Sequence, residues 1–312
     1  MDKDTQNSLI ATNEQLKERL LRWLPQPGRV TTSIPGLFLS RRDVTNQAES
    51  CFYSPTVGIV VQGFKRSVIG NEEYQYGEGY CMMAGVDMPS VNHITVASPE
   101  KPFLALSIKL DRYLVTQLAT EVPPNPKGNP GSYNGVVVSE VTFDILDAFL
   151  RLVGLLDTPE RIPILAPMII KEIHYGLLIG PQGGCLRLVS TLGTQTNQIA
   201  QAISWLRENY REVLQIEKLA SQVNMAESTF HRHFRKVTGL SPLQFQKRLR
   251  LYEAQRLMLV EDKDAATAAL HVGYESTTQF NREYKRQFGE PPHRDVSRMR
   301  EAGIGSAGIA ML

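Results

Sequence analysis

The chain has 312 residues, which is enough for two domains that each have a hydrophobic core. Its 42% hydrophobic and 21% charged residues are ordinary for a soluble globular protein and exclude long disordered stretches. The net charge at pH 7 is only +2, but residues 195–300 hold 17 Lys and Arg against 12 Asp and Glu, whereas residues 1–194 hold 17 against 19. The positive charge therefore lies towards the C-terminus, as binding to phosphate groups requires.

Cysteine usage and the N-terminus indicate the compartment. Cys51, Cys81 and Cys185 are too few and too scattered for a disulfide scaffold, and no CxxC pair indicates zinc. The polar N-terminal segment lacks the basic and apolar stretches of a secretory signal, and no run reaches the ~18 apolar residues of a membrane span. We therefore expect a cytoplasmic protein with no membrane partner.

The N-terminal half predicts mainly short strands. Residues 16–24 read as one short amphipathic helix, which two prolines end. From residue 34 to residue 110, short β-rich runs alternate with turn residues such as Gly70 and Gly79, which predicts a small antiparallel barrel or sandwich. Residues 122–132, VPPNPKGNPGS, predict a loop or linker.

Two helices are expected next, near residues 141–156 and 164–179. The first carries apolar residues at helical spacing: Val141, Ile145, Leu146, Phe149, Leu152, Val153 and Leu156. This stripe fits packing against the barrel, and it also fits the seam of a dimer. Residues 192–197 are polar and predict a link to the basic region, and residues 301–312 predict a loose tail.

The C-terminal third repeats one unit. LASQVNMAESTFHRHFRKVTGLSP, residues 219–242, returns as AALHVGYESTTQFNREYKRQFGEPP, residues 268–292. Each copy predicts a short helix, a turn and a second helix with aromatic residues on one side and basic residues on the other. This is the layout of a helix-turn-helix, here expected at about 217–238 and about 265–288. Two tandem copies predict a protein that reads two consecutive turns of DNA major groove.

Helical spacing divides each second helix into two faces. Phe230, Phe234 and Val237 share one face, as do Phe280, Tyr284 and Phe288, so these faces are expected in the core. The opposite faces supply the candidate contacts to DNA base edges: Ser228, His231, Arg232, Thr277, Thr278, Asn281 and Arg282. Residues further along each helix are candidates for phosphate contacts: Arg235, Lys236, Lys285 and Arg286.

Arginine suits a base-reading position because its planar fork can bond O6 and N7 of guanine together. A merely solvated polar face is the competing interpretation of these residues. The duplication speaks against it, because both copies place an arginine two residues before the second inward aromatic residue.

A longer helix is expected between the two units. Ser241 and Pro242 give an N-cap and a proline at the first helical position, and the ~17 residues that follow span about 25 Å at the standard rise. Such a helix can hold two recognition helices about one DNA turn apart, ~34 Å. Lys247, Arg248 and Arg250 on it fit either phosphate contacts or a solvated face.

With these residues in view, residues 198–300 resemble the DNA-binding domain of the AraC/XylS family of bacterial transcription regulators. The most specific piece is VGYESTTQFNREYKRQFGEPP. One departure is His293-Arg294, where the family more often has a polar residue leading to Tyr-Arg. Residues 1–194, with YSPTVGIVVQGFKRSVIG and ILAPMIIKEIHYGLLIGPQG, resemble the N-terminal regulatory domain of an AraC-type subgroup. The resemblance implies an α+β chain: a cupin-like β-barrel with flanking helices that senses an effector or dimerises, followed by an all-α domain of two helix-turn-helix units joined by a long helix.

Residues for enzymatic chemistry are missing from the pattern. The expected barrel holds one histidine, His93, whereas enzymatic cupins cluster several ligands around a metal. Glu172 and His174 lie two apart on a predicted helix and so face different ways. There is no GxSxG, P-loop or dinucleotide motif. We expect no catalytic residue, no metal and no cofactor. Cys51 and Cys81 fit either a sensing role or inert buried thiols.

The sequence therefore predicts a DNA-binding transcription regulator, by family habit an activator, that responds to a small-molecule effector and is nucleoid-associated. Its expected partners are double-stranded promoter DNA, the effector and, for an activator, RNA polymerase; a homodimer stays open. The alternatives are a cupin-like enzyme with an accessory DNA-binding domain and a constitutive DNA-binding protein without a ligand. No residue is assigned to the effector.

Overall fold

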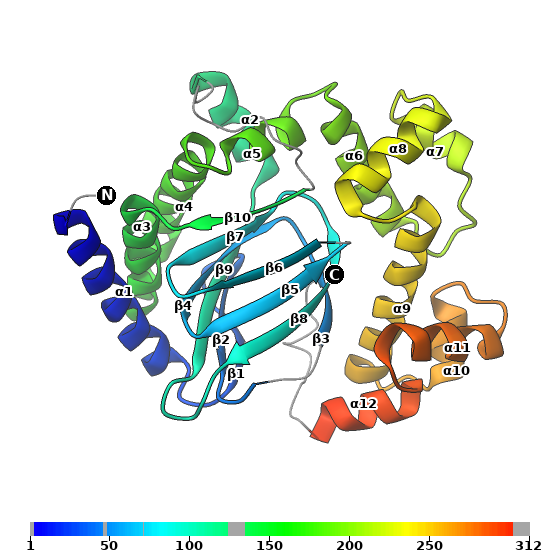
Figure 1. Cartoon of the computed structure of the whole chain (residues 1–312), viewed down its shortest axis with the longest axis horizontal. Coiled ribbons are helices and arrows are strands. Elements are labelled where there is room, and N and C mark those ends of the chain that lie inside the picture. The colour runs from blue at the N-terminus through cyan, green and yellow to red at the C-terminus, as the bar shows by residue number, and fades with distance from the viewer. Residues whose placement is uncertain (1–2, 46–48, 71, 124–134, 302–312) are drawn as a thin grey trace.

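The computed structural model describes residues 3–45, 49–70, 72–123 and 135–301. Figure 1 shows a strand-rich N-terminal part, flanked by helices, beside an all-helical C-terminal part. The fold is thus of the α+β class, as predicted. The expected barrel region consists of two separate antiparallel sheets.

The larger sheet has six strands in the order β1-β2-β9-β4-β7-β10. They are β1 (Gly28–Thr31), β2 (Leu37–Arg42), β4 (Thr56–Gln62), β7 (Tyr80–Ala84), β9 (Phe103–Lys109) and β10 (Val136–Glu140). In its centre Val57 lies opposite Ile108 on one side and Met83 on the other, and all three side chains are buried. Central strands of this apolar composition form because both neighbours and one covered face remove them from water.

The smaller sheet has the order β3-β8-β5-β6. Its strands are β3 (Glu49–Tyr53), β5 (Phe64–Ile69), β6 (Glu72–Gly77) and β8 (Met88–Val96). Side chains alternate between the two faces of a strand, so Lys65 and Ser67 of β5 point the same way. Ser67 is fully buried and donates a hydrogen bond to Asn92 of β8, 2.7 Å away. Lys65 therefore also faces the interior of the molecule.

Helices cover the N-terminal part: α1 (Lys3–Trp23), α2 (Arg112–Glu121), α3 (Phe143–Gly154), α4 (Ile162–Ile179) and α5 (Gly183–Ser190), with two short turns of 3₁₀ helix, η1 (Leu155–Asp157) and η2 (Pro159–Arg161). Helix α3 packs against both α1 and α4. Its apolar stripe is buried within the chain, which speaks against the dimer seam, and its main partners are these helices instead of the predicted barrel.

Helix α1 is much longer than the predicted 16–24. Its first turns are polar and mostly exposed, so they carry no apolar periodicity. The first buried side chains are the polar Thr12 and Asn13, and buried apolar residues begin only at Leu16. Helix α2 was not predicted at all. Asp111 caps it by accepting a hydrogen bond from the backbone N–H of Leu114.

One segment of the described chain, Pro159–Ile179, is long and apolar enough to cross a membrane by length and composition. This differs from the expectation that no run would qualify. The segment includes α4, which packs against α2, α3 and α5, and its residues Ile173, His174 and Leu177 are fully buried. Core helices of globular proteins commonly have this composition.

The C-terminal part is built from seven helices within the described residues: α6 (Gln195–Glu208), α7 (Ile216–Gln222), α8 (Glu227–Thr238), α9 (Pro242–Val260), α10 (Ala265–His271), α11 (Thr277–Phe288) and α12 (Pro292–Glu301). The pairs α7–α8 and α10–α11 are the two predicted helix-turn-helix units. Helix α9 joins them and starts, as predicted, with Ser241 as N-cap and Pro242 at its first position; Ser241 and Gln244 form a capping box.

The predicted connecting segments are residues 192–197, residues 122–132 and the tail 301–312. The polar segment 192–197 is only partly a link, because Thr194 caps α6 and the helix begins at Gln195. The predicted linker 122–132 lies outside the described residues after Pro123, and so does the predicted tail after Glu301.

The apolar core is continuous from the sheets through α6, α7 and α8 to the first half of α9. A second cluster surrounds the second half of α9 together with α10, α11 and α12. One of the contacts between the two parts of the chain lies at β3 and β8. Phe52 packs edge-on against Phe245 and Tyr252 of α9, with ring centroids 5.5 and 5.7 Å away, and the Tyr252 hydroxyl donates to the backbone carbonyl of Ser90.

Candidate DNA interface and ligand cavity

Helix α8 has one buried and one exposed face, as its pattern predicts. Phe230, Phe234 and Val237 are buried, and the rings of Phe230 and Phe234 contact each other at a tilt of 53°, with centroids 5.5 Å apart. The helix ends at Gly239, whose left-handed φ of 72° lets the backbone turn away. The exposed face is consequently fixed in direction by the packing of the opposite face.

Helix α11 repeats this arrangement with Phe280 and Tyr284 buried, whereas Phe288 is only partly buried. The acid on this helix, Glu283, is turned inward: it accepts hydrogen bonds from Tyr274 and from Lys247 of α9, each at 2.8 Å. Burial alone would raise the pKa of Glu283, but these hydrogen bonds and one from Gln279 outweigh it and lower the pKa. The carboxylate is therefore neutralised inside the domain and does not oppose the basic outer face.

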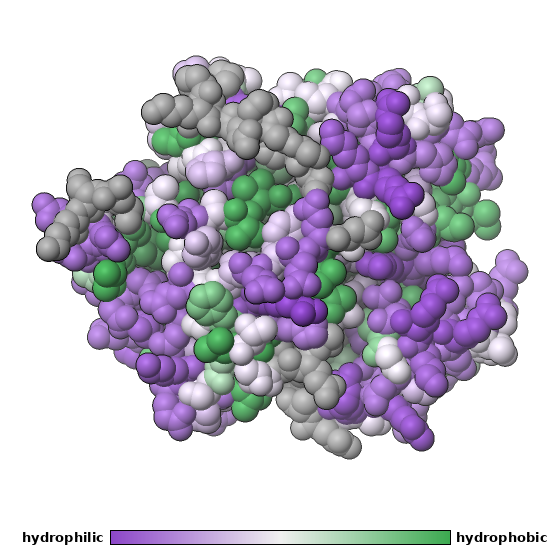
Figure 2. Space-filling model, viewed as in Figure 1, coloured by the Kyte–Doolittle hydropathy of each residue, from purple (hydrophilic) through white to green (hydrophobic). Residues whose placement is uncertain are grey.

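The predicted DNA-contacting residues lie where the sequence places them, on the outer faces of α8 and α11. His231 is partly buried, 3.8 Å from Glu227, and the others are exposed: Ser228, Arg232, Arg235, Lys236, Thr277, Thr278, Asn281, Arg282, Lys285 and Arg286. Among the described residues neither Arg232 nor Arg282 pairs with an acid. Figure 2 shows hydrophilic side chains over much of the surface of the C-terminal helices. The guanidinium groups of Arg232 and Arg282 are therefore available to bind phosphates or base edges.

Arg250 and Lys247 of α9 bind other parts of the protein. The sequence had left phosphate contacts or a solvated face as the alternatives for these residues. The Arg250 guanidinium donates to the backbone carbonyls of Tyr210, Arg211, Glu212 and Gly273, at 2.7 to 3.0 Å. It thereby fastens the loop before α7 to the turn before α11. Lys247 is the partner of Glu283.

His174 and Glu172, which the sequence excludes as a metal-binding pair, each have another partner. His174 is fully buried; its Nε2 accepts from the backbone N–H of Asp111 at 3.0 Å, and its Nδ1 lies 2.7 Å from the carbonyl oxygen of Ile170. Glu172 pairs with Arg151 on the surface. In the described part of the chain no group of three or more His, Cys, Asp or Glu side chains could hold a metal ion.

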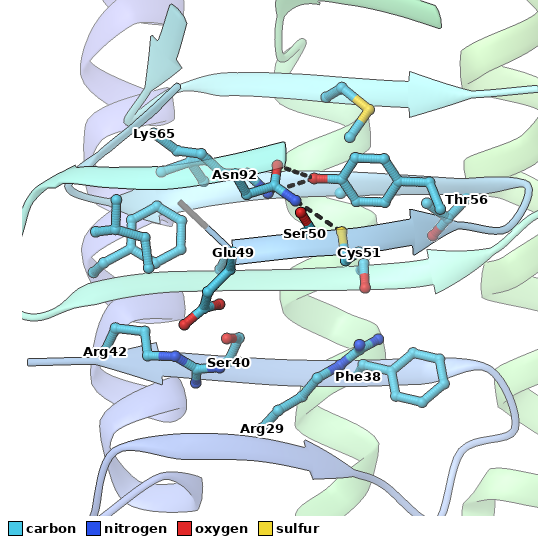
Figure 3. A pocket seen from close by; sticks show the side chains of 18 of the residues that line it. Arg29, Phe38, Ser40, Arg42, Glu49, Ser50, Cys51, Thr56, Lys65 and Asn92 are labelled. Carbon is cyan, nitrogen blue, oxygen red and sulfur yellow. Dashed lines mark hydrogen bonds between the residues drawn. The ribbon is translucent and has the colours of Figure 1, made fainter. Parts of the chain in front are cut away.

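A cavity of about 200 Å³ lies between the two sheets. Figure 3 shows Arg29, Phe38, Ser40 and Arg42 entering from β1 and β2, opposite residues of the smaller sheet. The smaller sheet contributes a largely polar set of side chains: Glu49, Ser50, Cys51, Tyr53, Lys65, Tyr76 and Asn92.

One wall of the cavity comes from the C-terminal helices. Its residues are Gln255, Phe288, Asp295, Arg298 and Met299. Asp295 is fixed there by Gln255 at 2.6 Å, by Tyr284 at 2.8 Å and by Arg298 at 2.6 Å. A molecule in the cavity would therefore contact both parts of the chain.

The cavity holds one of the two cysteines considered as sensors. Cys51 Sγ accepts a hydrogen bond from Asn92 and lies 3.0 Å from Ser90 Oγ. Burial raises the pKa of the Cys51 thiol and outweighs the opposing effect of Lys65 and Arg29. Burial also raises the pKa of Cys81, which lies beside Gln182 and Ser139. Both groups stay thiols at neutral pH, so neither is a preformed thiolate.

The sequence did not reveal this cavity. One local signal was available: Lys65 occupies an inward position in the alternating pattern of VQGFKRSVIG, where an apolar residue is expected. The lining residues, however, run from Arg29 to Met299, and only the pairing of strands and the docking of α12 bring them together.

Comparison with known proteins decides the family. Residues 33–185 match the model of the AraC-type transcriptional regulator N-terminus, and residues 219–298 match the model of a helix-turn-helix domain. The chain belongs to the AraC family of transcriptional regulators. This AraC-family chain thus falls in a family of transcription factors and not of enzymes.

Curated relatives include two activators. The HTH-type transcriptional activator RhaS of Salmonella schwarzengrund is 29% identical over 167 residues, which cover 53% of this chain and 58% of RhaS. RhaS of Pectobacterium carotovorum is 26% identical over 136 residues, 44% of this chain and 47% of RhaS. The chain spans about half the length of the curated relatives it matches.

Solved structures of the same fold include ToxT of Vibrio cholerae. The unsaturated-fatty-acid-bound ToxT superposes with a TM-score of 0.57 at 9% identity, over 84% of this chain and 93% of ToxT. ToxT bound to (E)-4-(8-methylnaphthalen-1-yl)but-3-enoic acid gives 0.56 at 10% identity, over 83% and 96%. At these identities the likeness concerns the fold.

Proposed function

We propose that this AraC-family protein is a transcription activator that binds promoter DNA with α8 and α11 in two consecutive major-groove segments. The observation that carries the proposal is the repeated outer face with Arg232 and Arg282 at matching positions, each free of an acid partner in the described chain. A guanidinium at such a site can bond O6 and N7 of guanine. The match to activators of the RhaS type supports activation, with RNA polymerase as a partner.

Each candidate contact has a role in this proposal. Base edges are read by Ser228, His231, Arg232, Thr277, Thr278, Asn281 and Arg282. Phosphates are bound by Arg235, Lys236, Lys285 and Arg286. The phosphate contacts set the position of each helix, whereas the base contacts choose the sequence.

The N-terminal domain, residues 1–194, has the role of effector sensor in the proposal, with the two sheets as the walls of a cupin-like barrel and residues 198–300 as the DNA-binding domain. The cavity between the sheets is the site for the effector, and its wall from α9, α11 and α12 is the route by which occupancy reaches the DNA-binding helices. The ligands in the ToxT structures support a small-molecule effector. A regulator of this kind acts in the cytoplasm at the nucleoid.

Selection of bound duplexes from a random DNA pool tests the DNA-binding part. We expect a motif of two blocks whose centres lie about one helical turn, ~10.5 base pairs, apart, because α9 separates two recognition helices. Affinity for the selected site is then measured at two salt concentrations. An absence of any enriched motif, with binding that collapses as salt rises, would mean phosphate attraction alone and would refute sequence-specific regulation.

A further inference from the structure

The cavity between the sheets contains more positive than negative charge. Its charged lining residues are four cations, Arg29, Arg42, Lys65 and Arg298, and two acids, Glu49 and Asp295. Asp295 already pairs with Arg298. Three cations therefore remain with one carboxylate. Charges removed from bulk water are costly unless an opposite charge lies near them.

Arg29 has no acid beside it. Its terminal nitrogen Nη2 is buried and has no hydrogen-bond partner in the described chain, and its guanidinium carbon lies 4.5 Å above the ring of Phe38. Burial lowers the pKa of Arg29; the groups that act on it are Cys51, Tyr53 and Arg42, of which none is a carboxylate. A buried guanidinium nitrogen without an acceptor is a vacant donor site.

Lys65, on the opposite sheet, likewise forms no ion pair with an acid among the described residues. Its Nζ donates to the Tyr53 hydroxyl at 2.6 Å and lies 5.2 Å from the centre of that ring. The Tyr53 hydroxyl in turn donates to Asn92 at 2.7 Å, so it keeps a partner without the lysine. Lys65 and Arg29 line the same cavity as Cys51, and the charge of each opposes the rise of the Cys51 pKa that burial causes.

The rest of the lining is suited to an apolar body of limited size. Aromatic rings from both sheets and from α11 line the space: Phe38, Tyr53, Tyr76, Phe103 and Phe288. Its volume of about 200 Å³ is below that of typical sites for drug-sized ligands, roughly 300–1,000 Å³. The occupant is therefore compact.

We propose that the cavity binds a compact organic carboxylate, whose anionic group lies between Arg29 of β1 and Lys65 of β5 and whose apolar part packs against the aromatic lining. The anion supplies the acceptor that Arg29 Nη2 lacks and offsets the excess positive charge. It thereby links β1 of the larger sheet to β5 of the smaller one across the cavity. This inference rests on the proposed effector role of the cavity, and it adds the chemical class of the effector.

The test uses the full chain without DNA, so that its outcome does not depend on the DNA-binding proposal. Hexanoate, octanoate and 4-phenylbutyrate, each beside its neutral amide, are titrated by calorimetry and by thermal shift. We expect at least one acid to bind and to raise the melting temperature, and every acid that binds to do so about tenfold or more tightly than its amide, because hydrogen bonds to charged groups are the stronger ones. If no acid binds, or if the amides bind equally well, the proposal is wrong.

Two variants locate the anion. Arg29→Met and Lys65→Met should each weaken binding of the acid about tenfold or more and leave the amide unaffected. Arg66→Gln is the matched control, because Arg66 is the next residue on β5, points to the other side and lies near Glu73; it should bind the acid as the wild type does. Equal affinity of all three variants for the acid would overturn the placement.

The melting temperature without ligand gives a second readout. No other group would lose its last hydrogen bond if Arg29 or Lys65 were removed. Replacing either by methionine should therefore leave the melting temperature unchanged or raise it. Affinity for the selected DNA without ligand should stay that of the wild type. A marked fall in melting temperature would mean that the cation is part of the structure and not of a ligand site, and would contradict the proposal.

Discussion

At the scale of single residues, Arg232 and Arg282 are the positions on which sequence reading should depend. Replacing either by alanine should cost ~1–3 kcal/mol of binding free energy on the best site and relax the preference at one base position, because a bidentate contact to guanine is lost. Competition binding on a set of single-base variants of the site measures both effects.

Arg235→Ala is the control for this comparison. A phosphate contact carries no sequence information, so this change should weaken all sites about equally and reduce the slope of log affinity against log salt by about one. Uniform weakening by Arg232→Ala or Arg282→Ala as well would show that the residue concerned binds phosphate.

The buried His174 should make stability depend on pH. Burial lowers its pKa below the ordinary 6.5, more than the hydrogen bond to Ile170 and the charge of Asp111 raise it. Between that lowered value and pH 6.5 the unfolded chain binds more protons than the folded one, so stability should fall as pH falls below 6.5. In His174→Gln the loss of stability from pH 7.5 to pH 5.5 should be smaller.

Urea unfolding at several pH values measures this difference. Glutamine can accept from the Asp111 N–H and donate to the Ile170 carbonyl, so the cost at pH 7.5 should stay at about 1–2 kcal/mol. The control is His271→Gln, at an exposed position. A pH dependence of His174→Gln as steep as that of the wild type would assign the effect to other groups.

At the scale of elements, the β5–β6 hairpin touches the first recognition helix. A Cβ on Gly70, which has a left-handed φ of 61°, would lie 2.7 Å from the carbonyl oxygen of Thr238 at the end of α8. Gly70→Ala should therefore cost more than the ~1–2 kcal/mol of a left-handed alanine, and it should change DNA affinity by displacing α8 from the hairpin.

Gly79→Ala is the matched control, because Gly79 has a φ of 80° but nothing within 4 Å of its Cβ. Gly79→Ala should lose only the folding stability that a left-handed alanine costs, and its affinity for DNA should be unchanged. Melting temperature and affinity for the selected site measure both variants. If they prove equal in both quantities, the hairpin does not support α8.

The elements also show what the sequence could predict. Helices α8 and α11 were predictable because their apolar spacing agrees with the glycines that end them, and α9 because Ser241 and Pro242 mark its start. Helix α2 was missed although Asp111 is a cap signal, since the strand pattern just before it dominated the interpretation. The order of the strands was not predictable, because β9 inserts between β2 and β4, far away in sequence. The cavity depends on that order.

At the scale of the whole molecule, the two helix-turn-helix units differ in their support. The buried residues of α8 belong to the core that runs through the sheets, whereas those of α11 belong to a smaller cluster formed by α9, α10, α11 and α12. A small core buries less apolar surface and opens at lower free energy. Amide hydrogens of α10 and α11 should therefore exchange faster than those of α8, through an opening that leaves the sheets folded.

Hydrogen exchange followed by mass spectrometry distinguishes the two units, with and without the selected DNA. If α11 docks in the major groove, DNA should slow exchange in α10 and α11 more than in α8, because binding stabilises the unit that opens most readily. A duplex with only the block read by α8 serves as control and should protect α8 alone. Equal exchange in α8 and α11 without DNA would mean that both units open together. The second unit would then not open independently of the first, and it could not adjust on its own to the DNA block that it reads.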